Sequence, residues 1–310
     1  MLGSPRMSWM DVLRGAAILL VILGHSSDLV LLVGREAPQL LHDVNTAAAP
    51  YRIPLLMFLS GMLVPNSLAK GVRPYLTGKV RGILWPYVVW TLLILLATGA
   101  FTAEAALGML WLPPTLLWYL QVLFVGYVVA LLTRVVNPLW PAAVALVGSA
   151  LVPFDEYRLG RMLFLIAAFL CGTWAWQHRE RWLGVVRRWW VMALLAVPTA
   201  VGAWFAITVG DTQYNPLAFP LVACGLALAL GLAQRVPDAR IIRYIGRNSI
   251  VFYVTHWIVV FWSIRLLDAA VPGLPALVLV AAALASAVLV GLGVTWLSLR
   301  VRPVALLFRI

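Results

Sequence analysis

The sequence has very little charge for its length. Only 11 % of its 310 residues are charged and 63 % are hydrophobic, whereas a typical soluble domain carries about a quarter charged residues. This composition excludes a soluble globular protein and predicts a polytopic membrane protein. Acidic residues are the scarcest, 11 against 23 lysines and arginines, and the formal net charge is +12. Because cytoplasmic loops of membrane proteins are rich in lysine and arginine, this charge predicts no nucleic-acid partner.

The sequence also lacks motifs for a disulfide, a metal site or a bound cofactor, and it lacks room for a soluble domain. The two cysteines, Cys171 and Cys224, lie inside apolar runs and are expected to be small buried residues rather than a disulfide or metal pair. The four histidines have no metal-ligand spacing and no glycine-rich phosphate loop occurs, so we expect no metal and no permanently bound cofactor. No connecting segment is long enough for a soluble catalytic domain. We therefore expect residues 1–310 to form a single transmembrane domain, with the first apolar run retained as a span rather than cleaved as a signal peptide.

Apolar runs of membrane-spanning length predict an all-α fold of about ten transmembrane helices. The expected spans are residues 9–33, 52–69, 83–101, 115–133, 138–153, 159–177, 189–209, 216–234, 249–268 and 274–298. An even number of spans places both termini on one side. With both termini inside, 18 of the 23 lysines and arginines lie on the cytoplasmic side. The remaining five lie outside: Arg35, Arg52, Arg158, Arg161 and Arg265. The sequence therefore predicts a multi-pass protein of the cell (inner) membrane with N-in and C-in topology.

The first span carries two ionisable residues, Arg14 and His25, eleven positions apart. At roughly 100° per residue they share one helix face, about 16 Å apart along the axis. Asp11 lies one turn before Arg14 and is placed to pair with it, and Asp28 lies one turn beyond His25, where it can orient the imidazole or bind a substrate. The structural alternatives are that Arg14 extends to the headgroups and that His25 only packs. Because ionisable residues are costly inside a membrane, the pair on one face favours a functional site.

Five segments, taken in order, resemble motifs of the membrane acyltransferase 3 family. The first is Asp11-x-Leu-Arg14-Gly15-x-Ala-Ile with His25, which is similar to the family's R-x10-H signature. The others are Tyr51–Leu63, which resembles R-x-P-x-F-F-x-S-G-F/M-L; Tyr75–Tyr87, a basic stretch ending in Pro-Tyr; Leu117–Leu120, which resembles L-W-F/Y-L; and Ile245–His256, which resembles G-x-N-S-x3-Y-x2-H. Each motif is weak by itself, but together they cover most of the chain.

The resemblance implies transfer of an acyl group, acetyl in the first instance, from cytoplasmic acyl-CoA to a hydroxyl of an outward-facing glycan or lipid-linked saccharide. His25 would then be the catalytic residue, either as general base or as acyl carrier, assisted by Arg14. Cations should line the entry of the anionic acyl-CoA co-substrate, and Arg14, Lys79 and Arg81 meet this need, although positive-inside topology also explains the two loop residues. The partners expected are acyl-CoA, the acceptor and the bilayer; a homo-oligomer is left open.

The remaining candidates are expected on the acceptor side. Arg52 is expected to open the second helix beside Pro54 and to face the acceptor or anchor at the interface. Trp118 and Tyr119 fit an aromatic belt or contacts with a sugar or acyl group. His256 is a substrate-binding or a packing residue. Asp28 is the last of the residues expected to bind the acceptor. Two further expectations are structural: Ser60 and Gly61 should allow close helix packing, and Asn248-Ser249 should cap the ninth span.

A transporter or flippase of a glycan or small solute is the main alternative to an enzyme. Transporters commonly show repeated halves with corresponding broken helices. No convincing internal repeat appears here, and the Arg14–His25 pair has no counterpart in the second half of the chain. Both observations favour the enzyme.

Overall fold

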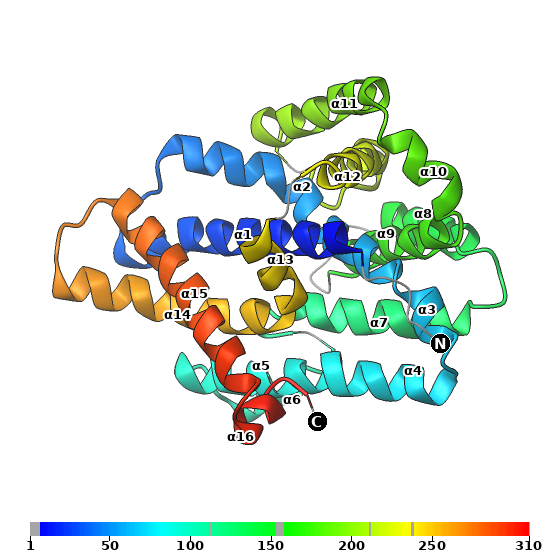
Figure 1. Ribbon diagram of the computed structural model, residues 1–310. Coiled ribbons are helices and arrows are strands. Elements are labelled where there is room, and N and C mark those ends of the chain that lie inside the picture. The colour runs from blue at the N-terminus through cyan, green and yellow to red at the C-terminus, as the bar shows by residue number, and fades with distance from the viewer. Residues whose placement is uncertain (1–6, 112, 153–157, 211, 237–238, 310) are drawn as a thin grey trace.

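The computed structural model describes residues 7–111, 113–152, 158–210, 212–236 and 239–309, and all that follows concerns these residues. They are helical, with no strand, and helix makes up 81 % of the structure. Most of the long helices run along a common direction, with α1 in the middle of the bundle (Figure 1). The predicted all-α fold is confirmed.

The helices in chain order are α1 (Ser8–Leu29), η1 (Val30–Val33), α2 (Gln39–Gly61), α3 (Val64–Leu68), α4 (Val72–Lys79), the π-helical η2 (Val80–Leu84), α5 (Trp85–Ala97), α6 (Ala103–Gly108), α7 (Trp118–Leu132) and α8 (Leu139–Leu151). They continue with α9 (Leu159–Gln177), α10 (Arg179–Val186), α11 (Trp189–Thr208), η3 (Pro216–Ala218), α12 (Phe219–Ala233), α13 (Arg240–Arg247), α14 (Ser249–Ala270), α15 (Ala276–Ser298) and α16 (Arg302–Leu306).

Eight of the described helical segments are long and apolar enough to cross a membrane. The other two predicted spans correspond to shorter apolar helices, α7 of 15 residues and α8 of 13. Large apolar side chains face outward on the peripheral helices, as a lipid-facing surface requires; Leu194 of α11, for example, is 70 % exposed. The sidedness of the termini stays a prediction from the charge distribution.

The second helix differs from its prediction. We expected it to begin at Arg52, but α2 begins at Gln39, so Arg52 lies deep inside the helix. The expectation placed the helix start where the apolar run of spanning length begins, beside Pro54. Instead Pro50 and Pro54 both lie inside α2, a position that packed membrane helices tolerate. The first turn is supported by a 2.7 Å hydrogen bond from Gln39 to Asp43.

The helix start expected at Asn248-Ser249 is confirmed, since α14 begins at Ser249 with Asn248 in the N-cap position, but the capping hydrogen bond is absent. The Asn248 side chain makes no capping hydrogen bond to α14. Its Nδ2 instead donates to the carbonyl of Tyr244 at 2.9 Å, at the end of α13. Because α13 precedes α14 directly, the side-chain amide of Asn248 bonds a carbonyl in the last turn of α13 rather than an amide of α14. The same carbonyl also accepts from the Asn248 backbone N–H at 3.2 Å.

The core is organised around α1, which packs against α2, α12, α13, α14 and α15. The helix pair α2 and α9 approaches closely where Gly61 of α2 faces the backbone carbonyl of Phe169. A Cβ atom at Gly61 would overlap that carbonyl, so only glycine allows this approach. Close packing at Gly61 was expected from its small size, and the structure confirms it.

Candidate active site

His25 and His256, 231 positions apart in the sequence, lie together between α1 and α14. Their rings are stacked with centroids 5.4 Å apart and planes 19° apart. Trp257 meets the His25 ring edge-on at 5.7 Å. These contacts fix the orientation of His25 by packing alone, because its ring makes no hydrogen bond with the described part of the chain. Both nitrogens of His25 therefore stay available for a substrate.

The protonation pattern of His256 follows from its backbone contact. Its Nδ1 lies 2.6 Å from the carbonyl oxygen of Tyr253, and a carbonyl can only accept, so Nδ1 carries the proton and donates. The other ring nitrogen, Nε2, is buried without a partner among the described residues. A neutral His256 therefore offers a lone pair at Nε2. The hydroxyl of Ser26, which follows His25 in α1, is likewise buried without a partner among the described residues.

A second cluster surrounds Arg14, toward the N-terminal end of α1. The Arg14 Nη2 donates to the carbonyl of Leu59 at 3.0 Å. Lys79 lies nearby, with its Nζ 3.9 Å from the Tyr127 ring centroid, and Arg14 is its strongest charged neighbour. Neither cation has a carboxylate within ion-pair distance in the described ranges. Two positive charges held in this way form a site suited to an anion.

Two other residues expected near Arg14, Arg81 and Asp11, do not join this cation pair. Arg81 is exposed on η2 and makes no polar or ring contact with the described residues, so the structure does not join it to Arg14 and Lys79. Asp11 was expected to pair with Arg14, but it instead forms an ion pair with Arg247 of α13 at 3.2 Å. This ion pair ties α1 to the segment that leads into α14, and so helps to bring His256 to His25.

At the other end of α1, Arg52 and Asp28 line a polar cavity of about 240 Å³. The Arg52 Nη1 donates to the carbonyl of Leu20 at 3.3 Å and also binds Asn45 Oδ1. Asp28 is exposed and acts electrostatically on Arg52. Gly24 leaves room for this arrangement, because a Cβ atom there would displace the Arg52 guanidinium and the Asn45 amide.

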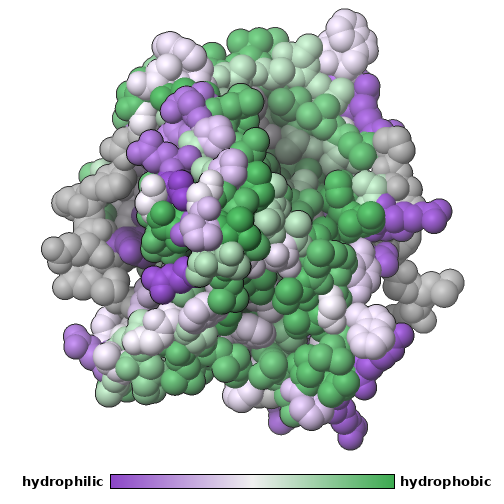
Figure 2. All heavy atoms as spheres, turned by 90° about the vertical axis from the view of Figure 1, so that its left-hand side faces the viewer, coloured by the Kyte–Doolittle hydropathy of each residue, from purple (hydrophilic) through white to green (hydrophobic). Residues whose placement is uncertain are grey.

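Arg52 is also an electrostatic neighbour of His25, so the cavity adjoins the histidine pair. Figure 2 shows the end of the molecule at the left of Figure 1, where α1 ends and α2 begins. Hydrophilic side chains gather there beside a broad hydrophobic area, as expected where a bundle meets the edge of a membrane.

The two aromatic candidates of α7 have separate positions. Tyr119 is buried and meets Tyr253 edge-on with centroids 5.2 Å apart, and Tyr253 lies 5.6 Å from His256. Trp118 instead stacks under Arg161 of α9, whose guanidinium carbon is 3.6 Å from its ring centroid. The structure therefore connects Tyr119 to the histidine pair through Tyr253, and Trp118 to a neighbouring cationic group.

Sequence reasoning missed Trp257 and Tyr214. From the sequence, Arg158 and Arg161 are expected to form an outer charged cluster with Asp155 and Glu156, in a solvated loop. The acidic residues assigned to that loop, Asp155 and Glu156, lie outside the described residues. Tyr214 has a polar neighbourhood with an Asn-Pro turn signal and no other mark in the sequence. Its packing against Trp118, with ring centroids 6.1 Å apart, places it near the site.

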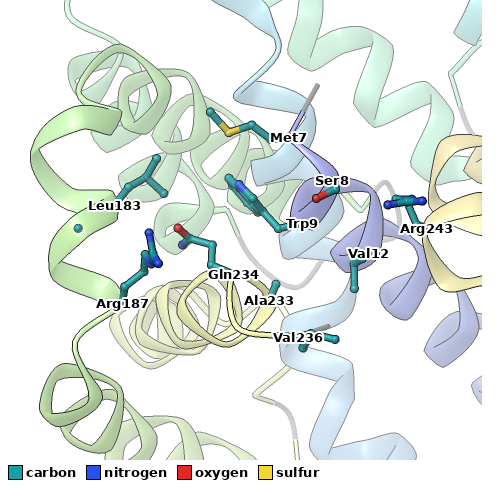
Figure 3. Close-up of a pocket in the computed structure, with 11 residues that line it drawn as sticks. Met7, Ser8, Trp9, Val12, Leu183, Arg187, Ala233, Gln234, Val236 and Arg243 are labelled. Carbon is teal, nitrogen blue, oxygen red and sulfur yellow. The ribbon is translucent and has the colours of Figure 1, made fainter. Parts of the chain in front are cut away.

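A larger cavity, of about 540 Å³, opens at the N-terminal end of α1 (Figure 3). Trp9 extends toward Gln234, while Arg243 lies beyond Ser8 and Val12 (Figure 3). By helical geometry Trp9 and Val12 are on a face of α1 well away from Arg14. The cavity is therefore separated from the Arg14–His25 face. No group of three or more metal-ligating side chains occurs within the described ranges.

The comparisons with known proteins agree with this architecture. A family model described as an acyltransferase domain, acyltransferase 3, matches residues 7–296. No curated protein and no solved structure matches the chain. The family match includes every residue of the candidate site and extends over nearly the whole chain. The described helices include eight of membrane-spanning length. The chain thus belongs to the acyltransferase 3 family of membrane acyltransferases.

Proposed function

We propose that this protein is a membrane O-acyltransferase that moves an acyl group, acetyl in the first instance, from cytoplasmic acyl-CoA to a hydroxyl of an outward-facing glycan or lipid-linked saccharide. The observation that carries the proposal is the position of His25. It lies on one helix between an unneutralised cation pair, Arg14 and Lys79, and a polar cavity lined by Arg52 and Asp28.

The donor enters at the Arg14 end. The phosphates of CoA bind Arg14 and Lys79, which otherwise lack carboxylate partners in the described part of the chain. About 16 Å separates Arg14 from His25 along α1, a span that the extended arm of CoA can bridge to deliver its thioester. Acyl-CoA acts as a co-substrate, and no resident cofactor takes part in the proposal.

The acceptor enters from the opposite end of α1, which charge distribution predicts to face outward. His25 accepts the proton of the acceptor hydroxyl as the hydroxyl oxygen attacks the thioester carbonyl. The carbon–sulfur bond then breaks, the CoA thiolate takes the proton from His25, and an ester and free CoA leave. In the alternative route the imidazole takes the acyl group first, releases CoA, and passes the acyl group to the hydroxyl.

The test is acyl transfer by purified protein in phospholipid nanodiscs supplied with radiolabelled acetyl-CoA. We expect His25→Ala to lower the rate of CoA release at least about 100-fold, the usual contribution of a general base. His178→Ala is the matched control, since His178 stacks on Trp174 at 4.7 Å in another part of the bundle and should keep full activity. A normal rate in folded His25→Ala would refute the proposal. A burst of about one CoA per protein without acceptor would select the acyl-histidine route.

A further inference from the structure

A cationic cluster adjoins the acceptor cavity and shares Arg52 with it. We call it the Tyr214 cluster; it consists of Arg52, Trp118, Arg161 and Tyr214. The Arg161 guanidinium stacks on Trp118 at 3.6 Å and lies 5.9 Å from the Tyr214 ring centroid. Its Nε is buried without a hydrogen-bond partner among the described residues. Arg161 is therefore held by aromatic packing, with hydrogen-bonding capacity left over.

Tyr214 holds the centre of this cluster in an unusual backbone conformation. Its φ is +64°, a left-handed value that residues other than glycine rarely adopt. The ring fixes that conformation by edge-on contacts to Trp118 and to Phe164, with centroids 6.1 and 6.0 Å away. Burial raises the pKa of Tyr214, so its phenol stays neutral and adds no negative charge. A strained residue retained in this way is typical of a ligand-binding segment.

Arg52 approaches the same segment from α2. Both Arg52 and Arg161 act electrostatically on Tyr214, and Arg161 lies 5.9 Å from the centroid of its ring. Arg52 lines the polar cavity together with Thr212 and Gln213, which directly precede Tyr214. Neither arginine has a carboxylate within ion-pair distance in the described ranges, and Asp28 is the described carboxylate of the cavity wall. The described lining itself holds one cation, Arg52, and one carboxylate, Asp28. With Arg161 beside Tyr214, the described cavity and cluster together hold two arginines and one carboxylate.

We infer that the acceptor is anionic, with carboxylate or phosphate oxygens bound between Arg52 and Arg161 beside Tyr214. Guanidinium groups bind such oxyanions through paired hydrogen bonds, which the unpartnered Arg161 can supply. Because Arg52 also neighbours His25, an acceptor held here presents its hydroxyl to the imidazole. The inference rests on the proposed acyl transfer and narrows its substrate class to saccharides that carry a negative charge.

The experiment compares three acceptor probes that share one sugar ring: methyl glucoside, methyl glucuronoside and methyl glucoside 6-phosphate. Labelled acetyl-CoA is supplied to purified protein in nanodiscs, and transfer to each probe is measured as kcat/KM. We expect at least a tenfold preference for one of the anionic probes over the neutral glucoside. A preference for the glucuronoside identifies a carboxylate ligand, and a preference for the phosphate identifies a phosphate ligand.

The variants then locate the preference. Arg161→Gln should bring the ratio of kcat/KM for the anionic acceptor to kcat/KM for the neutral acceptor close to one. Arg161→Lys should recover part of the preference for the anionic acceptor. Arg265→Gln is the matched control, because Arg265 also stacks on an aromatic ring, Phe261 at 4.7 Å, but lies outside the cluster. It should keep the wild-type ratio. Thermal unfolding confirms that each variant is folded.

Three outcomes overturn the inference: equal use of neutral and anionic probes, an unchanged ratio in Arg161→Gln, or CoA release without transfer to any probe. Failure of the proposed function gives a different result, since wild-type protein would then release no CoA from acetyl-CoA, with or without a probe. The two failures are thus separable in one assay.

Discussion

At the scale of single residues, the most informative feature is a polar atom kept buried without a partner. His256 is 1 % exposed, and its Nε2 has no hydrogen bond among the described residues. Leaving such a group unsatisfied costs roughly 1–3 kcal/mol of folding free energy. A cost of this size, located 5.4 Å from His25, is understandable if Nε2 binds a substrate hydroxyl or stabilises the proton on His25 during transfer.

This interpretation predicts opposite effects of one substitution on stability and on activity. His256→Phe keeps an aromatic ring against His25 but removes the buried nitrogen. We expect the unfolding temperature to stay the same or rise, while the rate of acyl transfer falls about 10- to 100-fold, the lower range for a group assisting proton transfer. Wild-type activity in His256→Phe would instead identify His256 as a packing residue. Differential scanning calorimetry and the labelled acetyl-CoA assay provide the two measurements.

At the scale of helices, the packing of α1 on α2 determines the acceptor end. Helical periodicity predicts that Arg14 and His25 share a face, and the structure keeps both on one uninterrupted helix. Periodicity could not predict that Arg52 would lie against Gly24, because this contact depends on α2 starting at Gln39 and continuing through Pro50 and Pro54. The error at this helix arose because the span was taken from the apolar run alone, whereas α2 also includes the more polar residues before it and continues through both prolines.

The contact between Arg52 and Gly24 can be tested with two glycine substitutions in membrane helices. Gly24→Ala should displace the Arg52 guanidinium, because the new methyl group would occupy its position, and we expect acceptor kcat/KM to fall about tenfold. Gly293→Ala of α15 is the control, since nothing lies within 4 Å of the added carbon. Alanine is the better helix former by about 1 kcal/mol, so the control should be active and slightly more stable. Equal activity of both variants would show that Arg52 tolerates displacement.

At the scale of the whole molecule, the orientation in the membrane decides whether donor and acceptor meet from opposite sides. Charge distribution places the α7–α8 connection in the cytoplasm and the α11–α12 connection outside. Val135 lies in the first of these connections, and Leu217 lies in η3, the first turn after the second connection. The two are almost equally exposed, at 85 % and 86 %. They are therefore a matched pair for labelling.

The prediction uses single cysteines in a background with Cys171 and Cys224 replaced by alanine. A membrane-impermeant maleimide should label Leu217→Cys in intact cells and Val135→Cys only in inverted vesicles. Labelling of both from the same side would contradict the ten-span topology. It would also remove the physical basis for a donor and an acceptor approaching His25 from opposite ends of α1.

The amino-acid sequence by itself determined the helical membrane class, the common face of Arg14 and His25, and the motifs that resemble the acyltransferase 3 family. These depend on composition, on periodicity and on residues close together in the chain. Only the tertiary structure decided that His256 stacks on His25 and that Arg161 and Tyr214 join Arg52. Such contacts are set by how distant helices pack, and the mainly apolar surfaces of these helices carry little local information about which neighbour each one meets.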